Sequence, residues 1–138
     1  MNDHTFDSLR IGQKEGFSRR ISHQDIEKFS ELSGDINPLH LDSDFAVSMG
    51  YEKKVGFGML ASSFYSTLAG VYLPGKYSLI VKEESSFYRP FFEGDTLKIE
   101  GEIKDKKEFG SLIFVDTKIN NQDAETIVKG KMIIKVLK

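Results

Sequence analysis

The segment from residue 57 to residue 72 constrains the fold most, because it has no charged side chain at any position. Large apolar residues recur there at helical spacing, and small or hydroxyl-bearing residues fill the other faces; the large ones are Met59, Leu60, Phe64, Leu68 and Val71. A helix that is apolar or small all round is expected to be buried all round. The sequence therefore predicts a central helix, ended by Pro74-Gly75, that the rest of the chain must cover.

The chain after Gly75 changes to a hydrophobic period of two, which indicates strands. We expect four of them, at 78–88, 95–105, 110–120 and 125–137, with a further strand within 10–20. The last range places Val128, Met132, Ile134 and Val136 on one face, and 95–105 does the same for Leu97, Ile99 and Ile103. This order predicts an α+β fold in which an antiparallel sheet wraps around one long helix.

Two shorter helices are predicted before the central one. Ser22 and Asp25 have the spacing of a capping box, and Gly34 is expected to end the helix that they open. Asp42 or Ser43 should cap a second helix that runs through Met49. Between these helices, Pro38 disfavours helical geometry at Asn37, so 35–41 is expected to be a loop without a helix.

Length and composition limit the functional classes. A chain of 138 residues predicts one domain, at 1–138, and a net charge of −2 argues against nucleic acid as the main partner. Cysteine is absent, which excludes disulfides and thiolate catalysis and fits a cytoplasmic location. Neither a signal-peptide layout nor a membrane span is recognisable, and no metal-ligand constellation occurs.

The loop at 35–41 holds the candidate catalytic pair. Gly34 and Pro38 shape a segment in which Asp35 and His40, five residues apart, could be turned toward one point. A carboxylate and an imidazole so placed could activate a water and return its proton. The structural alternative is that Asp35 caps the next turn and His40 makes a buried hydrogen bond. Asn37 likewise either orients the pair or binds substrate, or only forms an Asn-Pro turn.

The start of the central helix is a candidate anion site. Free N–H groups at a helix start favour developing negative charge, and Gly58 would let a carbonyl oxygen approach the backbone. Close packing between helix and strand is the alternative reason for a glycine. Further along the helix, Ser66 could face the site or simply bond to a backbone carbonyl one turn earlier.

Ser-Gly-Asp-Ile-Asn-Pro-Leu-His-Leu-Asp at 33–42 resembles the signature of MaoC-like (R)-specific enoyl-CoA hydratases, a branch of the hotdog-fold proteins. The resemblance extends over about 8–137, with support from 58–66 and 86–95. It implies a hotdog fold, a homodimer, a water held by Asp35 and His40, and an oxyanion-binding amide at Gly58. It also implies that Ser66 faces the site. The sequence departs from the family at Phe57, where a histidine is usual.

The resemblance implies (R)-specific hydration of a trans-2-enoyl-CoA to the (R)-3-hydroxyacyl-CoA, with Asp35 as base and His40 as proton donor. No cofactor is expected besides the coenzyme A thioester that serves as substrate. One alternative is the same chemistry on an acyl carrier protein thioester or an unusual acyl group. A thioesterase is disfavoured by the Asn-Pro-x-His segment. A hotdog protein that only binds acyl thioesters is kept open by Phe57.

Overall fold

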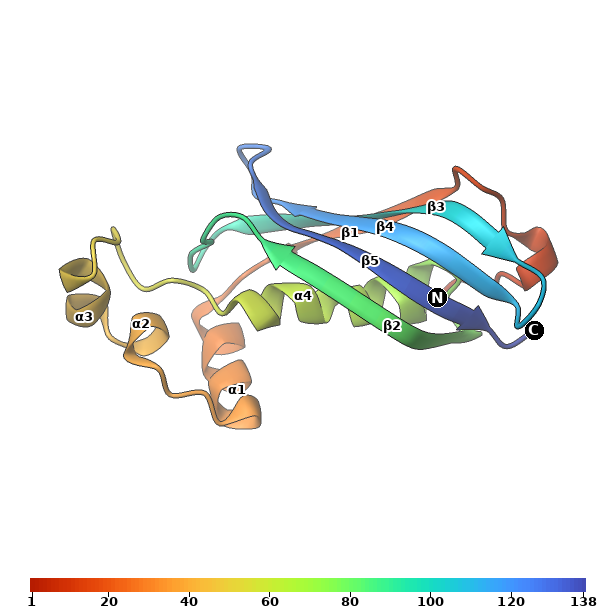
Figure 1. The fold of residues 1–138 in the computed structure, drawn as a ribbon. Helices are drawn as coiled ribbons and strands as arrows, with labels where there is room; N and C mark the ends of the chain where they lie inside the picture. Colours follow the sequence, from red (N-terminus) through yellow and green to blue (C-terminus); the bar gives the residue numbers. More distant parts are fainter.

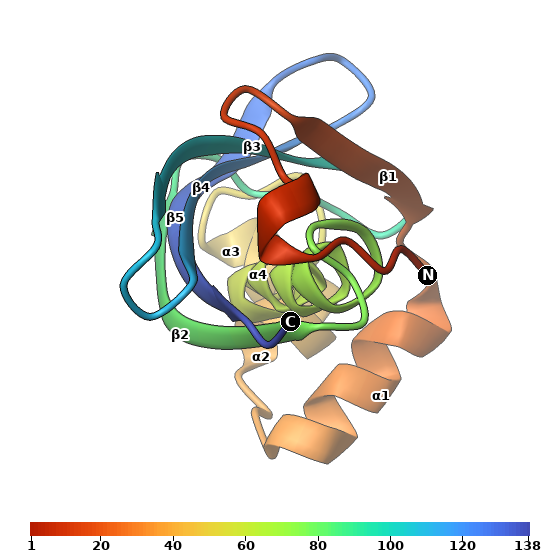
Figure 2. The same ribbon diagram turned by 90° about the vertical axis from the view of Figure 1, so that its right-hand side faces the viewer.

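The computed structural model describes all residues from 1 to 138, and its centre is a curled antiparallel sheet. Five strands form it in the order β1-β3-β4-β5-β2: β1 (Lys14–Arg20), β2 (Ser78–Phe87), β3 (Thr96–Lys107), β4 (Leu112–Asn120) and β5 (Thr126–Val136). Figure 2 shows the sheet curving around the central helix α4 (Gly58–Thr67). These elements confirm the predicted α+β hotdog arrangement, with strand ends within a few residues of those expected.

The core lies between the inner face of the sheet and α4, which continues into a π-helical stretch η2 (Leu68–Tyr72). Alternate strand residues point inward and are buried, as predicted for the second and last strands after the helix. Gly101 lets the helix approach closely, because a Cβ there would lie 2.9 Å from Cδ2 of Leu68. The sheet thus fixes the position of the helix, and with it the start of α4.

The expectation that α4 is buried all round is wrong for this chain. Leu60, Ala61 and Tyr65 face the sheet and are buried, whereas the side chain of Met59 is 65% exposed and Ser66 is exposed. The reason is geometric: a five-stranded sheet curls around only one side of the helix. None of the helices is long and apolar enough to cross a membrane.

Strand β2 forms one edge of the sheet and leaves large apolar side chains exposed. It pairs only with β5, and its ladder is interrupted by a register shift between Ile80 and Lys82. Val81, at this irregularity, is 59% exposed, and Leu79 and Phe87 are also exposed. An edge strand presents unpaired backbone N–H and C=O groups, so this edge combines unpaired backbone groups with exposed apolar side chains.

Three helices connect β1 to α4 outside the curl of the sheet; the first lies beside the N-terminal end of α4 and the two shorter ones lie beyond it (Figure 1). Helix α1 (His23–Ser33) begins with the predicted Ser22–Asp25 capping box and ends at Gly34, whose φ is +76°. Helix α3 (Ser43–Ser48) is capped by Asp42. Residues 6–8 form a 3₁₀ turn, η1 (Phe6–Ser8), that was not expected.

The prediction that no helix forms within 35–41 is wrong. A short helix α2 (Pro38–Leu41) occupies the second half of this segment. Pro38 stands at its first position, where the missing N–H has no intrahelical partner to lose and the fixed φ suits a helix. Proline therefore starts this helix instead of preventing it.

Candidate active site

Asp35 follows directly after the end of α1 and is held by its backbone. The hydroxyl of Ser30, which is buried, donates to the carbonyl oxygen of Asp35 at 2.8 Å. In the side chain, Oδ1 accepts the N–H of Asn37 at 3.0 Å, and Oδ2 has no hydrogen bond within the chain. The carboxylate thus forms the local turn that was considered as the structural alternative, but Asp35 is exposed and Oδ2 is not used in that turn.

Asn37 caps α2 and so places the histidine. Its Oδ1 accepts the N–H of Leu39 at 3.0 Å, and its carbonyl oxygen accepts the N–H of His40 at 3.0 Å. These contacts are those of an Asn-Pro turn, the simpler of the two readings of this residue. They fix the backbone of α2 relative to the loop that carries Asp35.

His40 is fixed by a hydrogen bond at one ring nitrogen and leaves the other free. Nδ1 lies 2.7 Å from the carbonyl oxygen of Val55, and Nε2 has no partner within the chain. A carbonyl oxygen only accepts, so we assign the proton to Nδ1. In the neutral imidazole, Nε2 is then the acceptor, and in the imidazolium it is the donor that faces a reactant.

The imidazole also lies on an aromatic ring. The ring centroids of His40 and Phe57 are 4.1 Å apart, with 35° between the planes. Phe57 is 2% exposed, and it also contacts a second aromatic ring, that of Phe29, whose centroid is 5.1 Å away. The residue at which this chain departs from the family pattern therefore contacts the candidate catalytic histidine directly.

The start of α4 presents free backbone N–H groups, as expected. The first helical hydrogen bonds run from Leu60 and Ala61 to the carbonyl oxygen of Phe57, at 3.0 and 3.3 Å. The N–H groups of Gly58 and Met59 precede them and have no intrahelical acceptor. A Cβ on Gly58 would lie 3.0 Å from Cδ1 of Phe87, so the glycine also allows the Phe87 ring to lie over the helix start.

The structure brings the His40 ring against Phe57, which directly precedes Gly58, and Asp35 lies on the loop that leads to His40. No hydrogen bond joins Asp35 to His40. Ser66 lies two turns beyond Gly58, on the exposed face of α4. The bond to a backbone carbonyl, the structural alternative for Ser66, is absent there, although Ser62 and Ser63 donate to the carbonyl oxygens of Met59 and Leu60 at 3.2 and 2.6 Å.

Sequence reasoning missed three contacts that shape this site: the Val55 carbonyl, the Ser30 hydroxyl and the Phe29 ring. Phe29 was visible as part of the apolar stripe of its helix, but no residue type signals which backbone carbonyl a histidine will meet.

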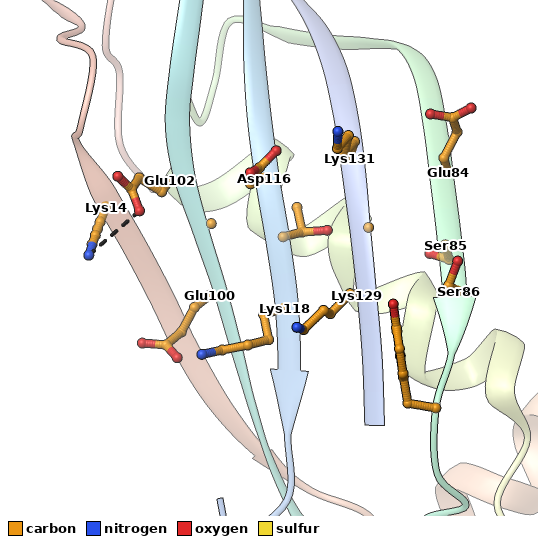
Figure 3. A pocket seen from close by; sticks show the side chains of 14 residues that line it. Lys14, Glu84, Ser85, Ser86, Glu100, Glu102, Asp116, Lys118, Lys129 and Lys131 are labelled. Atoms are coloured by element: carbon orange, nitrogen blue, oxygen red, sulfur yellow. Dashed lines mark ion pairs between the residues drawn. The ribbon is translucent and has the colours of Figure 1, made fainter. Parts of the chain in front are cut away.

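Two further polar features lie away from this site. Burial raises the pKa of Tyr65 to about 12, and its hydroxyl has no hydrogen-bond partner, so the phenol stays protonated near neutral pH. A hollow of about 930 Å³ lies on the outer face of the sheet, where Figure 3 shows charged side chains on the side away from α4. Lysines and carboxylates line it in equal number, and it contains none of the candidate catalytic residues.

Comparison with known proteins identifies the family. Residues 7–124 match the MaoC-like domain family. The chain is 36% identical to an (R)-specific enoyl-CoA hydratase of Aeromonas caviae, over 94% of this chain and 96% of that protein. It is 33% identical to a mitochondrial 3-hydroxyacyl-[acyl-carrier-protein] dehydratase of Arabidopsis thaliana, over 64% of this chain and 52% of that protein.

A solved structure extends the likeness to the whole fold. An unliganded R-hydratase from Pseudomonas aeruginosa superposes with a TM-score of 0.91 at 29% identity, covering 97% of this chain and 86% of that one. The family match spans most of the strands, α4 and the segment with Asp35 and His40. The chain therefore belongs to the MaoC-like domain family and has its hotdog fold.

Proposed function

We propose that this protein is a hydro-lyase that hydrates trans-2-enoyl-CoA to (R)-3-hydroxyacyl-CoA, and dehydrates it in reverse. One observation carries the proposal: Oδ2 of Asp35 and Nε2 of His40 are unengaged, and the His40 ring lies against Phe57, the residue directly before the free N–H groups at the start of α4. A proton acceptor, a proton donor and an oxyanion site are the parts that this reaction needs. Its relatives in Aeromonas and Rhodospirillum carry the name of the same activity.

The proposed chemistry begins with a water between the two side chains. Asp35 takes one proton as the water oxygen bonds to C3, and the electron pair of the double bond moves toward C2 and the thioester oxygen. The Gly58 N–H donates to that oxygen as charge develops on it. Nε2 of the His40 imidazolium then gives its proton to C2. A proton passed from Asp35 to His40 through the next water restores the site, and no electron is lost, so no cofactor is needed.

A homodimer is part of the proposal. The apolar edge strand β2 and the uncovered face of α4 adjoin the helix start, and a second copy would cover both surfaces at once. Pairing of β2 with its counterpart would satisfy the unpaired backbone groups and extend the sheet. The acyl chain would then lie between α4 and the subunit interface, where Ser66 is exposed in one chain.

The test is the loss of enoyl-thioester absorbance from crotonyl-CoA, with free thiol measured in parallel. We expect wild type to lose the absorbance without releasing thiol, and Asp35→Asn and His40→Ala to be at least about 10²-fold slower. Chiral analysis of the product should give the (R) isomer. Thiol release in step with the absorbance change would contradict the proposal and indicate a thioesterase.

A second candidate is dehydration of an acyl carrier protein thioester, favoured by the similarity to the Arabidopsis dehydratase. The same assay with crotonyl groups on coenzyme A and on a carrier protein separates the two. A higher kcat/KM for the carrier-protein substrate would select this alternative, with the same residues in the same roles.

A further inference from the structure

We propose that Phe57 is the positioning residue for His40: its buried ring holds the imidazole so that Nε2 faces the reacting atoms. This inference rests on the proposed function and concerns the residue at which the chain departs from its family. The first argument is the contact itself, with ring centroids 4.1 Å apart. The two planes are tilted by 35°, and at this distance the imidazole has no room to tip further toward Phe57.

The second argument is that one hydrogen bond does not orient an imidazole. The bond from Nδ1 to the Val55 carbonyl fixes one edge of the ring, but the ring can still pivot about that contact. Phe57 lies against the face of the same ring and blocks the pivot. The edge contact and the face contact together define the direction of Nε2, which neither contact does alone.

The third argument is that Phe57 is itself rigid. It is 2% exposed and rests on Phe29. The backbone before it is clamped, because the N–H of Val55 donates to the carbonyl oxygen of Leu39 at 3.1 Å while the Val55 carbonyl accepts from His40. Gly56 donates to the carbonyl oxygen of Phe91 at 2.7 Å, and a Cβ at Gly56 would lie 2.3 Å from the Phe91 ring.

The consequence is a coupling between two parts of the site. Phe57 supports the imidazole with its side chain and precedes, in the same short segment, the amide of Gly58. The phenyl ring has no donor or acceptor, so it acts only through shape and packing. An aromatic replacement should therefore keep the function of the position better than an aliphatic one of similar volume.

The test uses the ring protons of His40 in NMR spectra, which are assignable because the chain has three histidines. In wild type we expect upfield shifts from the Phe57 ring current and NOEs between the two rings. Phe57→Leu should lose the upfield shifts, and Phe57→Tyr should keep them. Absence of both signals in wild type overturns the proposal, whether or not any variant folds.

Kinetics give the second readout, measured with whichever crotonyl thioester, on coenzyme A or on a carrier protein, the wild type hydrates faster. Misplacing a catalytic group by about 1 Å can cost about 10²-fold in rate, so Phe57→Leu should lower kcat by about 10- to 10²-fold with KM within about twofold. Phe57→Tyr should recover most of kcat, and thermal melting checks that both variants are folded. A raised KM with unchanged kcat would show that Phe57 is a wall of the substrate site, and would overturn the positioning role. If wild type hydrates neither thioester, the proposed function fails, and the NMR shifts alone decide whether Phe57 orients His40.

Discussion

At the residue scale, His40 uses one nitrogen in a structural hydrogen bond and leaves the other free for the proposed chemistry. The bond to the Val55 carbonyl consumes Nδ1, so Nε2 alone is left to exchange protons with a reactant. The two carboxylate oxygens of Asp35 differ in the same way: Oδ1 accepts a hydrogen bond in the local turn, and Oδ2 has no partner. The structural and catalytic readings of these residues therefore do not exclude each other, because each reading concerns a different atom.

Gly58→Ala tests the helix start as an oxyanion site. The added methyl group would meet the Phe87 ring at about 3.0 Å, and this half-exposed ring is able to move aside, so we expect a folded protein. The methyl group would also stand where the thioester oxygen must approach the amide. Hydration should therefore slow by about 10²-fold, the cost of losing one oxyanion donor.

The double variant Gly58→Ala/Phe87→Ala is the control for that experiment. If the methyl group excludes the substrate oxygen, making room for it at Phe87 does not restore the rate. Recovery in the double variant would instead trace the loss to the displaced ring, and full activity of the single variant would remove Gly58 from the oxyanion site.

At the scale of elements, side-chain signals predicted the boundaries well where they act locally. The capping box at Ser22, the glycine at the end of α1 and the period of two in the strands each depend on a few neighbouring residues. The α2 helix was missed because Pro38 was read as a helix breaker and not as a first helical residue. The hydrogen bond from His40 to Val55 could not be predicted. Its acceptor is a backbone carbonyl fifteen residues away, and every residue type has such a carbonyl.

The capping box also predicts a pH dependence of stability. Burial alone would raise the pKa of Asp25, but hydrogen bonds from Ser22 and the contact with Arg19 outweigh it and lower the pKa. A carboxyl whose pKa is lower in the folded state stabilises the fold above its unfolded value of about 3.9, and this stability is lost as pH falls through the folded value.

Urea unfolding at several pH values measures this dependence. Wild type should lose more stability below about pH 5 than Asp25→Asn, which keeps the shape of the side chain without its charge. Glu102, whose pKa is lowered mainly by its hydrogen bond with Lys104, contributes equally to both proteins and cancels in the comparison. If stability falls equally with pH in the two proteins, the capping box stabilises α1 without a contribution from the charge of Asp25.

At the scale of the whole molecule, one chain covers its central helix on one side only. The side chains left uncovered on α4 and β2 are the ones that a second copy would bury in the proposed dimer. Charge at the edge should prevent this association, because a carboxylate buried without a partner is costly. Val81→Asp is therefore expected to convert the dimer to a monomer and to lower activity with it.

Sedimentation measures the association directly. The matched control is Phe109→Asp, which places the same charge at a 96% exposed side chain in the turn between β3 and β4, where no interface is proposed. This control should remain dimeric and active. A wild-type protein that sediments as a monomer and is still fully active would contradict the proposed dimer.

The half-covered helix has a consequence for how this protein tolerates dilution. A core helix that completes its burial only against a second copy makes association part of folding stability. The melting temperature then depends on protein concentration. The wild-type Tm should climb as the protein is concentrated, while that of the Val81→Asp variant should stay flat. The amount of protein that a cell makes would then set how much heat the fold withstands.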